Sequence, residues 1–150
     1  GAKYLYCRIH SENKSSIALA KKLGFLKIDY HVEQDAKVLP LIIQPFVENA
    51  FVHGLESSED GGNLTVHVSR DMGVIVVTIE DDGVGMDYYQ LGKLRYAINS
   101  GEAAEKGHIG VSNVNQRLKL QYGEQFGVTV DSTLGKGTKI TIMMPFVFGE

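Results

Sequence analysis

The apolar residues of this 150-residue chain occur in short runs that end at polar or glycine-containing turns. None of these runs approaches the roughly 20 residues that a membrane-spanning helix requires. The sequence has 17 glycines and 3 prolines, and it is 43% apolar and 22% charged, which is typical of one soluble globular domain. A chain of this size buries about 70% of its unfolded surface, so one sizeable core needs no disulfide bonds.

Charge and cysteine content exclude several classes of protein. The formal net charge is −3 at pH 7, which argues against a broad surface for nucleic acid or anionic lipid, because those partners require clustered Lys and Arg. The single cysteine, Cys7, permits neither an internal disulfide nor a multi-thiolate zinc site. We therefore expect no nucleic-acid partner and no direct membrane contact by this domain.

Hydrophobic periodicity and turn residues predict a succession of helices and hairpins. Helical spacing of apolar residues predicts helices over 11–23, 40–53, 87–99 and 111–122. Strand-like runs occur at 4–9, 25–32, 64–69, 74–80, 126–132 and 139–148, and the last four form two hairpins. Elements in this order predict an α/β (α+β) two-layer sandwich, in which a mixed sheet is covered on one face by helices.

The helix predicted over 40–53 carries a carboxylate, an amide and an imidazole in a largely apolar sequence. Asn49 and His53 are four residues apart and are therefore neighbours on the helix, while Glu48 lies on the adjoining strip. Such a set suits divalent-metal binding and proton transfer. Taken alone, it also fits the exposed side of an amphipathic helix.

Three glycine-containing segments could contact a ligand. Asp81-Asp82-Gly83-Val84-Gly85 follows a strand, where an acid can accept a hydrogen bond from an exocyclic amine and the glycines allow close backbone approach. Gly107-His108-Ile109-Gly110-Val111 opens a helix, whose free amides favour phosphate. Gly135-Lys136-Gly137-Thr138 lies between strands, where glycines are common in hairpins. Each segment alone is also explained as an ordinary turn or helix start.

The order and spacing of these motifs resemble the ATP-binding domain of sensor histidine kinases, which belongs to the GHKL superfamily of gyrase, heat-shock chaperone, histidine kinase and MutL ATPases. The resemblance covers about residues 25–148. The segments 39–54 and 109–122 look closest to the LytS-like branch. The motifs are Gln44-Pro45-x-x-Glu48-Asn49-Ala50-x-x-His53-Gly54, Asp81-x-Gly83-x-Gly85, Gly110, and Gly135-x-Gly137-Thr138.

The resemblance implies a Bergerat-type fold with an ATP lid over 86–107, and ATP and Mg²⁺ as cofactors. It implies that Asn49 ligates the metal, that Glu48 is the catalytic acid that helps to activate the attacking group, and that Asp81 binds the adenine amino group. The other ATP-binding residues that it implies are His53, Gly83, Gly85, Met86, Ile109, Gly110, Val111 and Thr138.

The resemblance also implies partners and a location. The γ-phosphate would pass to a histidine on a phosphoacceptor segment of the parent kinase that is absent from this chain, and then indirectly to a response regulator. The domain would be cytoplasmic and its parent membrane-anchored. Because dimerisation in such kinases belongs to upstream helices, we expect the fragment to be monomeric.

Three departures from the family pattern keep alternatives open. Val52 stands where relatives often have a phosphate-facing lysine, so that contact would be absent or would come from elsewhere, for example from Lys93 or Lys106 in the lid. His108 replaces the first glycine of the third motif, and no Asn-Pro-His-Phe-like acceptor segment occurs. The alternatives are a nucleotide-sensing interaction module without phosphotransfer and a protein-serine kinase of the same superfamily.

The N-terminal residues are atypical of this family. Residues 12–25 look like a late helix of GNAT-type acetyltransferases, but this stretch spans only 14 residues and no matching pyrophosphate loop follows. We therefore divide the chain into an N-terminal strand–helix segment, 1–24, and an ATP-binding domain, 25–150. An acetyltransferase fragment is the third hypothesis.

Overall fold

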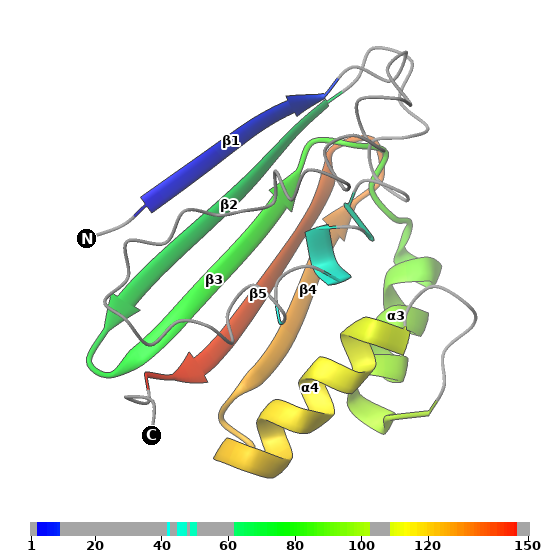
Figure 1. The fold of residues 1–150 in the computed structure, drawn as a ribbon. Helices are drawn as coiled ribbons and strands as arrows, with labels where there is room; N and C mark the ends of the chain where they lie inside the picture. The colour runs from blue at the N-terminus through cyan, green and yellow to red at the C-terminus, as the bar shows by residue number, and fades with distance from the viewer. Residues whose placement is uncertain are drawn as a thin grey trace.

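The structure is a computed structural model that describes residues 3–9, 42, 45–47, 49–50, 62–102 and 109–146, and it places them in two layers (Figure 1). One layer is a five-stranded sheet in the order β1-β2-β3-β5-β4. The helices α3 and α4 lie against one face, on the β4 side of the sheet (Figure 1). The elements are β1 (Lys3–Ile9), β2 (Gly62–Asp71), β3 (Val74–Asp81), α3 (Tyr88–Ser100), α4 (Ile109–Tyr122), β4 (Gly127–Thr133) and β5 (Gly137–Pro145).

The predicted two-layer α/β architecture is confirmed, with one correction to the sheet. We predicted a mixed sheet, whereas every pairing among the described strands is antiparallel. The reason lies in the topology: β3 and β4 point the same way, but β5 lies between them and pairs with both. The crossover through the two helices therefore joins parallel strands that are not neighbours.

The predicted hairpins are present, and the strands of the first, β2 and β3, are slightly longer than expected. Asp71 pairs with Val74, which leaves a two-residue turn at Met72 and Gly73. Both turn residues have positive φ, 47° and 79°, as a tight hairpin of this kind requires. The first strand of the chain, predicted at 4–9, pairs with β2 and ends the strand order of the described sheet. The strand predicted at 25–32 and the helix predicted at 11–23 lie outside the described residues.

The core lies between the helix-covered face of the sheet and the helices. Along β3, burial alternates with a period of two, so that Ile75, Val77 and Ile79 face the helices. Phe46 and Val47, from the helix predicted over 40–53, are fully buried in the same core, which places these two residues over the sheet. Among the described residues, no helix is long and apolar enough to cross a membrane.

Helix α3 begins at a capping box. The Asp87 side chain accepts a hydrogen bond from the backbone N–H of Gln90 (2.8 Å), and the Gln90 side chain accepts one from that of Asp87 (3.0 Å). Leu91, Leu94 and Ile98 bury the inner side of the helix in the core. The predicted helix is therefore confirmed, and the ATP lid over 86–107 stays a prediction.

Asn115 of α4 joins three elements. Its side chain is fully buried; its Nδ2 donates to the carbonyl of Ile98 in α3, and its Oδ1 accepts from the N–H of Val128 in β4, both at 2.8 Å. Gly127 has a φ of +137°, and any Cβ there would overlap Asn115 Oδ1. A buried amide with both ends bonded fixes how the two helices meet the edge strand.

Replacing Asn115 with alanine is expected to lower the free energy of unfolding by about 3 kcal/mol, because the Val128 N–H and the Ile98 carbonyl both lose their buried partner. Asn113→Ala is the matched control, since Asn113 is exposed on the same helix and both changes raise helix propensity equally. Urea unfolding measures both values. Equal changes in the two variants would contradict the role assigned to Asn115.

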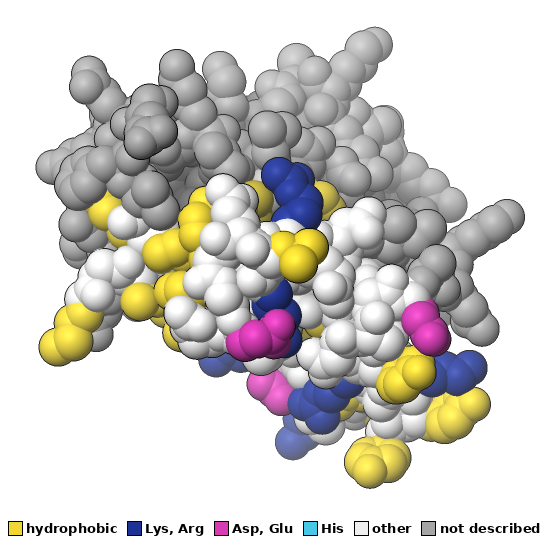
Figure 2. All heavy atoms as spheres, turned by 90° about the horizontal axis from the view of Figure 1, so that it is seen from below, with side chains coloured by type: hydrophobic (Ala, Val, Ile, Leu, Met, Phe, Trp, Pro, Cys, Tyr) yellow, Lys and Arg dark blue, Asp and Glu magenta, His cyan; other side chains and the backbone are white. Residues whose placement is uncertain are grey.

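Charged side chains on the underside of the molecule are mixed in sign. Figure 2 shows Lys and Arg close to Asp and Glu on the part of that face that is described. Within the described ranges, Arg95 forms an ion pair with Asp131 (2.7 Å) and Lys119 forms one with Glu124 (3.2 Å). Exposed pairs of this kind contribute little to stability, so packing and buried hydrogen bonds hold the layers together.

Candidate functional site

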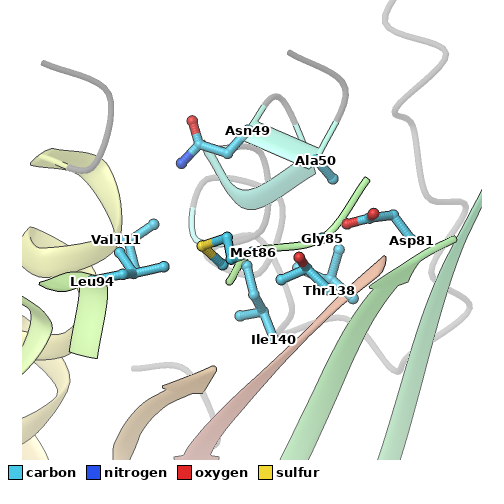
Figure 3. A pocket seen from close by; sticks show the side chains of 10 residues that line it. Asn49, Ala50, Asp81, Gly85, Met86, Leu94, Val111, Thr138 and Ile140 are labelled. Atoms are coloured by element: carbon cyan, nitrogen blue, oxygen red, sulfur yellow. The ribbon is translucent and has the colours of Figure 1, made fainter. Parts of the chain in front are cut away.

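A cavity opens between the sheet and the helices, where β3 ends (Figure 3). The empty space in the cavity and in its opening to solvent is together about 570 Å³. Asn49 and Ala50 come from the helical segment on one side, and Asp81 and Thr138 from the sheet on another (Figure 3). Its lining residues are Asn49, Ala50, Ile79, Asp81, Gly85, Met86, Leu94, Val111, Thr138 and Ile140.

The sheet gives the cavity an apolar floor with a polar end. Ile79 of β3 and Ile140 of β5 are paired in register, and the pair two residues further along is Asp81 with Thr138. Residues two apart on a strand lie on the same face, so all four side chains face the helices. The cavity therefore combines a flat apolar surface with a carboxylate and a hydroxyl.

Asp81 is a buried acid, with 6% of its surface exposed. Its Oδ1 accepts a hydrogen bond from the backbone N–H of Gly83 (3.0 Å). Burial raises the pKa of Asp81 above its ordinary 3.8, while hydrogen bonds from the backbone of Gly83 and Thr138 partly offset this shift. A carboxylate has about four acceptor positions, so Asp81 retains capacity for a donor from a ligand.

The neighbouring acid, Asp82, has a different role. It is exposed, and its two carboxylate oxygens accept from the backbone N–H and the side-chain Nδ2 of Asn63, each at 2.6 Å. The Asp82 N–H also donates to the Asn63 carbonyl (3.2 Å). Asp82 therefore ties the end of β3 to the start of β2, whereas Asp81 lines the cavity.

Two glycines allow the backbone segments around Asp81 to approach one another. A Cβ on Gly85, whose φ is +64°, would overlap the carbonyl of Thr133. A Cβ on Gly137, whose φ is +118°, would overlap the carbonyl of Asp81 itself. Only glycine fits at both places, and the loop after β3 therefore lies directly against the β4–β5 hairpin.

Ser132 of β4 connects this loop to the sheet. Its Oγ accepts from the N–H of Met86 (2.8 Å), contacts Thr138 Oγ1 (2.8 Å) and donates to the Gly137 carbonyl (3.0 Å). These contacts hold Met86 at the cavity wall and fix the side chain of Thr138. Nothing in the spacing of the sequence motifs marked Ser132, because its partners lie on two other segments, the loop after β3 and the start of β5.

The structure brings several predicted site residues together and leaves others undescribed. Asn49, Asp81, Gly85, Met86, Val111 and Thr138 line the cavity, and Gly83 contacts Asp81. Ile109 and Gly110 form the first turn of α4, where an added Cβ on Gly110 would lie 3.2 Å from Pro45 Cβ. Lys93 lies over the ring of Tyr89 (4.9 Å to its centroid) and is not a lining residue. The positions outside the described residues are Glu48, Val52, His53, Lys106 and His108.

Part of the apolar lining was not predicted from the sequence. Ile79 and Ile140 form the floor, and Leu94 of α3 forms part of a wall. The two isoleucines could have been found from strand alternation, since each lies two residues from a predicted site residue on its own strand. No sequence pattern marked Leu94 as a lining residue, because only the tertiary packing of α3 places it at the cavity wall.

A family model described as "Histidine kinase-, DNA gyrase B-, and HSP90-like ATPase" matches residues 34–147. The chain belongs to this family. The fold predicted from the motif order, that of the GHKL ATPases, is thereby confirmed, as is the resemblance to sensor histidine kinases.

Similar proteins include several sensor kinases. The sensor histidine kinase YesM of Bacillus subtilis is 30% identical over 80% of this chain and 20% of its own length. The sensor protein LytS of Bacillus cereus is 26% identical over 94% of this chain and 24% of its own length. YpdA of Escherichia coli is 31% identical over 80% and 20%. The chain thus spans 20–24% of the length of these relatives.

Among solved structures, the histidine kinase domain of the Erythrobacter litoralis EL346 blue-light activated histidine kinase is similar to this chain. The TM-score is 0.52, with 23% sequence identity over 72% of this chain and 43% of that one. At this level of identity, the similarity supports the fold alone.

Proposed function

We propose that this domain binds magnesium–ATP in the cavity and donates the γ-phosphate to a histidine on another segment of a LytS-like sensor kinase. The observation that carries the proposal is the buried carboxylate of Asp81 beside Thr138, at the end of an apolar cavity in a domain of this ATPase family. We infer that the partners are the phosphoacceptor segment and, indirectly, a response regulator.

The base would lie on the sheet side of the cavity. A purine is flat and apolar on its faces, which suits contact with Ile79, Ile140 and Met86. Its exocyclic amino group would donate to Asp81, the one buried carboxylate in the described lining. A charge-assisted hydrogen bond of this kind fixes the orientation of the base.

The phosphates would extend toward Asn49 and the N-terminus of α4, where Gly110 and Val111 lie in the first turn. Free amides at a helix start favour phosphate. The side-chain oxygen of Asn49 is a hard ligand and fits Mg²⁺, which takes few protein ligands besides phosphate oxygens and waters. When bound, the ion would neutralise phosphate charge during transfer. By resemblance, Glu48 would hold the acidic position next to it.

The remaining predictions about the parent protein belong to the same proposal. We propose that the domain is cytoplasmic and that its parent kinase is membrane-anchored, which would fit relatives named as sensor proteins. This chain spans about one quarter or less of the length of those relatives. We retain the division at residue 24, although β1, from the N-terminal segment, pairs with β2 of the sheet. The family match begins at residue 34, beyond the acetyltransferase-like stretch.

Calorimetric titration with a non-hydrolysable ATP analogue tests the binding step. We expect saturable binding that weakens roughly tenfold when magnesium is removed. Asn49→Ala should abolish this magnesium dependence but leave adenosine binding intact, because Asn49 lies across the cavity from Asp81. No binding at millimolar nucleotide by folded protein would refute the proposal.

Phosphotransfer needs a separate assay. Mixing the domain with an acceptor fragment of its kinase and labelled ATP should give phosphohistidine, which is acid-labile. Tight ATP binding without any labelled acceptor would favour the nucleotide-sensing module. Acid-stable label on a protein serine would favour the serine kinase.

A further inference from the structure

The hydrogen bonds of Ser132 determine which way the Thr138 hydroxyl points. Ser132 Oγ has three partners: the Met86 N–H (2.8 Å), the Gly137 carbonyl (3.0 Å) and the Thr138 hydroxyl (2.8 Å). An amide N–H can only donate and a carbonyl can only accept. The first two bonds therefore have fixed directions.

The direction of the third bond follows by counting protons. A serine hydroxyl has one proton and two lone pairs. The proton of Ser132 is used on the Gly137 carbonyl, and one lone pair on the Met86 N–H. Only a lone pair remains for Thr138, so Thr138 must donate. In this arrangement Ser132 uses all of its hydrogen-bonding capacity.

Thr138 consequently has no proton to give to a ligand. It lines the cavity, and its partner in register on β3 is Asp81, whose carboxylate also accepts. The two side chains lie side by side at the end of the sheet (Figure 3). This end of the cavity therefore presents acceptors from both side chains.

We propose that Ser132, which does not line the cavity, is a positioning residue for base specificity: it makes Thr138 an acceptor, so that the site selects a 6-amino purine and rejects a 6-oxo purine. This inference rests on the proposed function, since it requires that the cavity hold a purine nucleotide. A 6-oxo group would place a third acceptor against Asp81 and Thr138. The only donor on that edge of a 6-oxo purine is the N1–H, one ring position away, so it cannot replace the exocyclic donor that both acceptors face.

The test compares ATP with ITP, which differs at the 6 position, by competition titration against wild type and variants. We expect wild type to prefer ATP by at least roughly tenfold. Ser132→Ala frees the Thr138 hydroxyl to turn and donate to a 6-oxo group, so the preference should fall about threefold or more. Ser132→Thr retains the hydroxyl and should keep the wild-type preference.

A purely structural role for Ser132 would give a different result. Loss of the Met86 anchor alone would weaken ATP and ITP together and leave their ratio unchanged. Thr138→Val removes the hydroxyl and should also lower the preference, and adding Ser132→Ala to it should change the ratio no further. Additive effects on the ratio would overturn the inference, because Ser132 would then act independently of Thr138.

The outcomes separate this inference from the proposed function. If wild type binds no ATP, the proposed function fails. If wild type binds ATP but binds ITP equally well, or if Thr138→Val and Ser132→Ala leave the preference unchanged, only the role of Ser132 is refuted. Where Ser132→Ala does not fold, an unchanged preference in Thr138→Val still refutes the inference, because Ser132 is proposed to act through Thr138.

Discussion

Replacing Asp81 with asparagine is expected to weaken ATP binding by about 10- to 100-fold while the domain stays folded. The carboxylate would accept the adenine amino group in a buried, charge-assisted hydrogen bond, and such bonds contribute about 1.5–3 kcal/mol. Asparagine keeps the shape but can turn an NH₂ group toward that amine. Calorimetry of the binding, with thermal unfolding of the same samples, measures both effects.

Asp82→Asn is the matched control. Asp82 is adjacent in sequence but exposed, and it bonds to Asn63 instead of lining the cavity. We expect its ATP affinity to stay within about twofold of wild type, because an exposed side chain outside the cavity contributes little to binding. Similar loss of affinity in both variants, or parallel loss of binding and folding in Asp81→Asn, would contradict a base-binding role for Asp81.

The same variant has a predictable pH dependence. Burial raises the pKa of Asp81 in the folded state above 3.8, so the folded domain binds this proton more tightly than the unfolded chain. Its contribution to stability is therefore greatest below pH 3.8 and falls as pH rises through the folded-state pKa. The stability of Asp81→Asn relative to wild type should rise with pH across that window. Urea unfolding at several pH values checks the sign.

Gly137→Ala is expected to lower the free energy of unfolding by about 3 kcal/mol or more. The new Cβ would overlap the backbone of Asp81 and Asp82, which no side-chain rotation can relieve. The φ of +118° adds strain for any L-residue with a side chain. Because this backbone carries the cavity acid, ATP binding should be lost together with stability.

Gly135→Ala in the same hairpin turn separates steric overlap from backbone strain. Gly135 also has a positive φ, +79°, but a Cβ there meets nothing within 4 Å. Its substitution should cost only about 1 kcal/mol. Chemical denaturation of the two variants gives the comparison, and equal losses would show that close packing around Gly137 is not the main constraint.

Elements with local determinants could be predicted from the sequence. The β2–β3 hairpin depends on alternating apolar residues and a glycine turn, and α3 on the Asp87 cap and its apolar spacing. The family of the chain could also be recognised from the sequence, because the glycine motifs occur along the chain in the order and at the spacing typical of that family. That these motif residues bind ATP stays a prediction, although the structure brings Asn49, Asp81 and Thr138 to one cavity.

Features that depend on distant segments were decided only by the tertiary structure. Met86 and Ser132 are 46 residues apart and Asn115 and Ile98 are 17 apart, yet each pair is hydrogen bonded. Sequence periodicity shows which face of an element is apolar, but not which element lies against it. The insertion of β5 between β3 and β4 makes the described sheet antiparallel and brings Ser132, Thr138 and Asp81 onto adjacent strands. The sequence by itself determined the two hairpins, α3, α4 and the family. Packing determined which polar groups meet, because a buried donor or acceptor takes the partner that the fold places within reach.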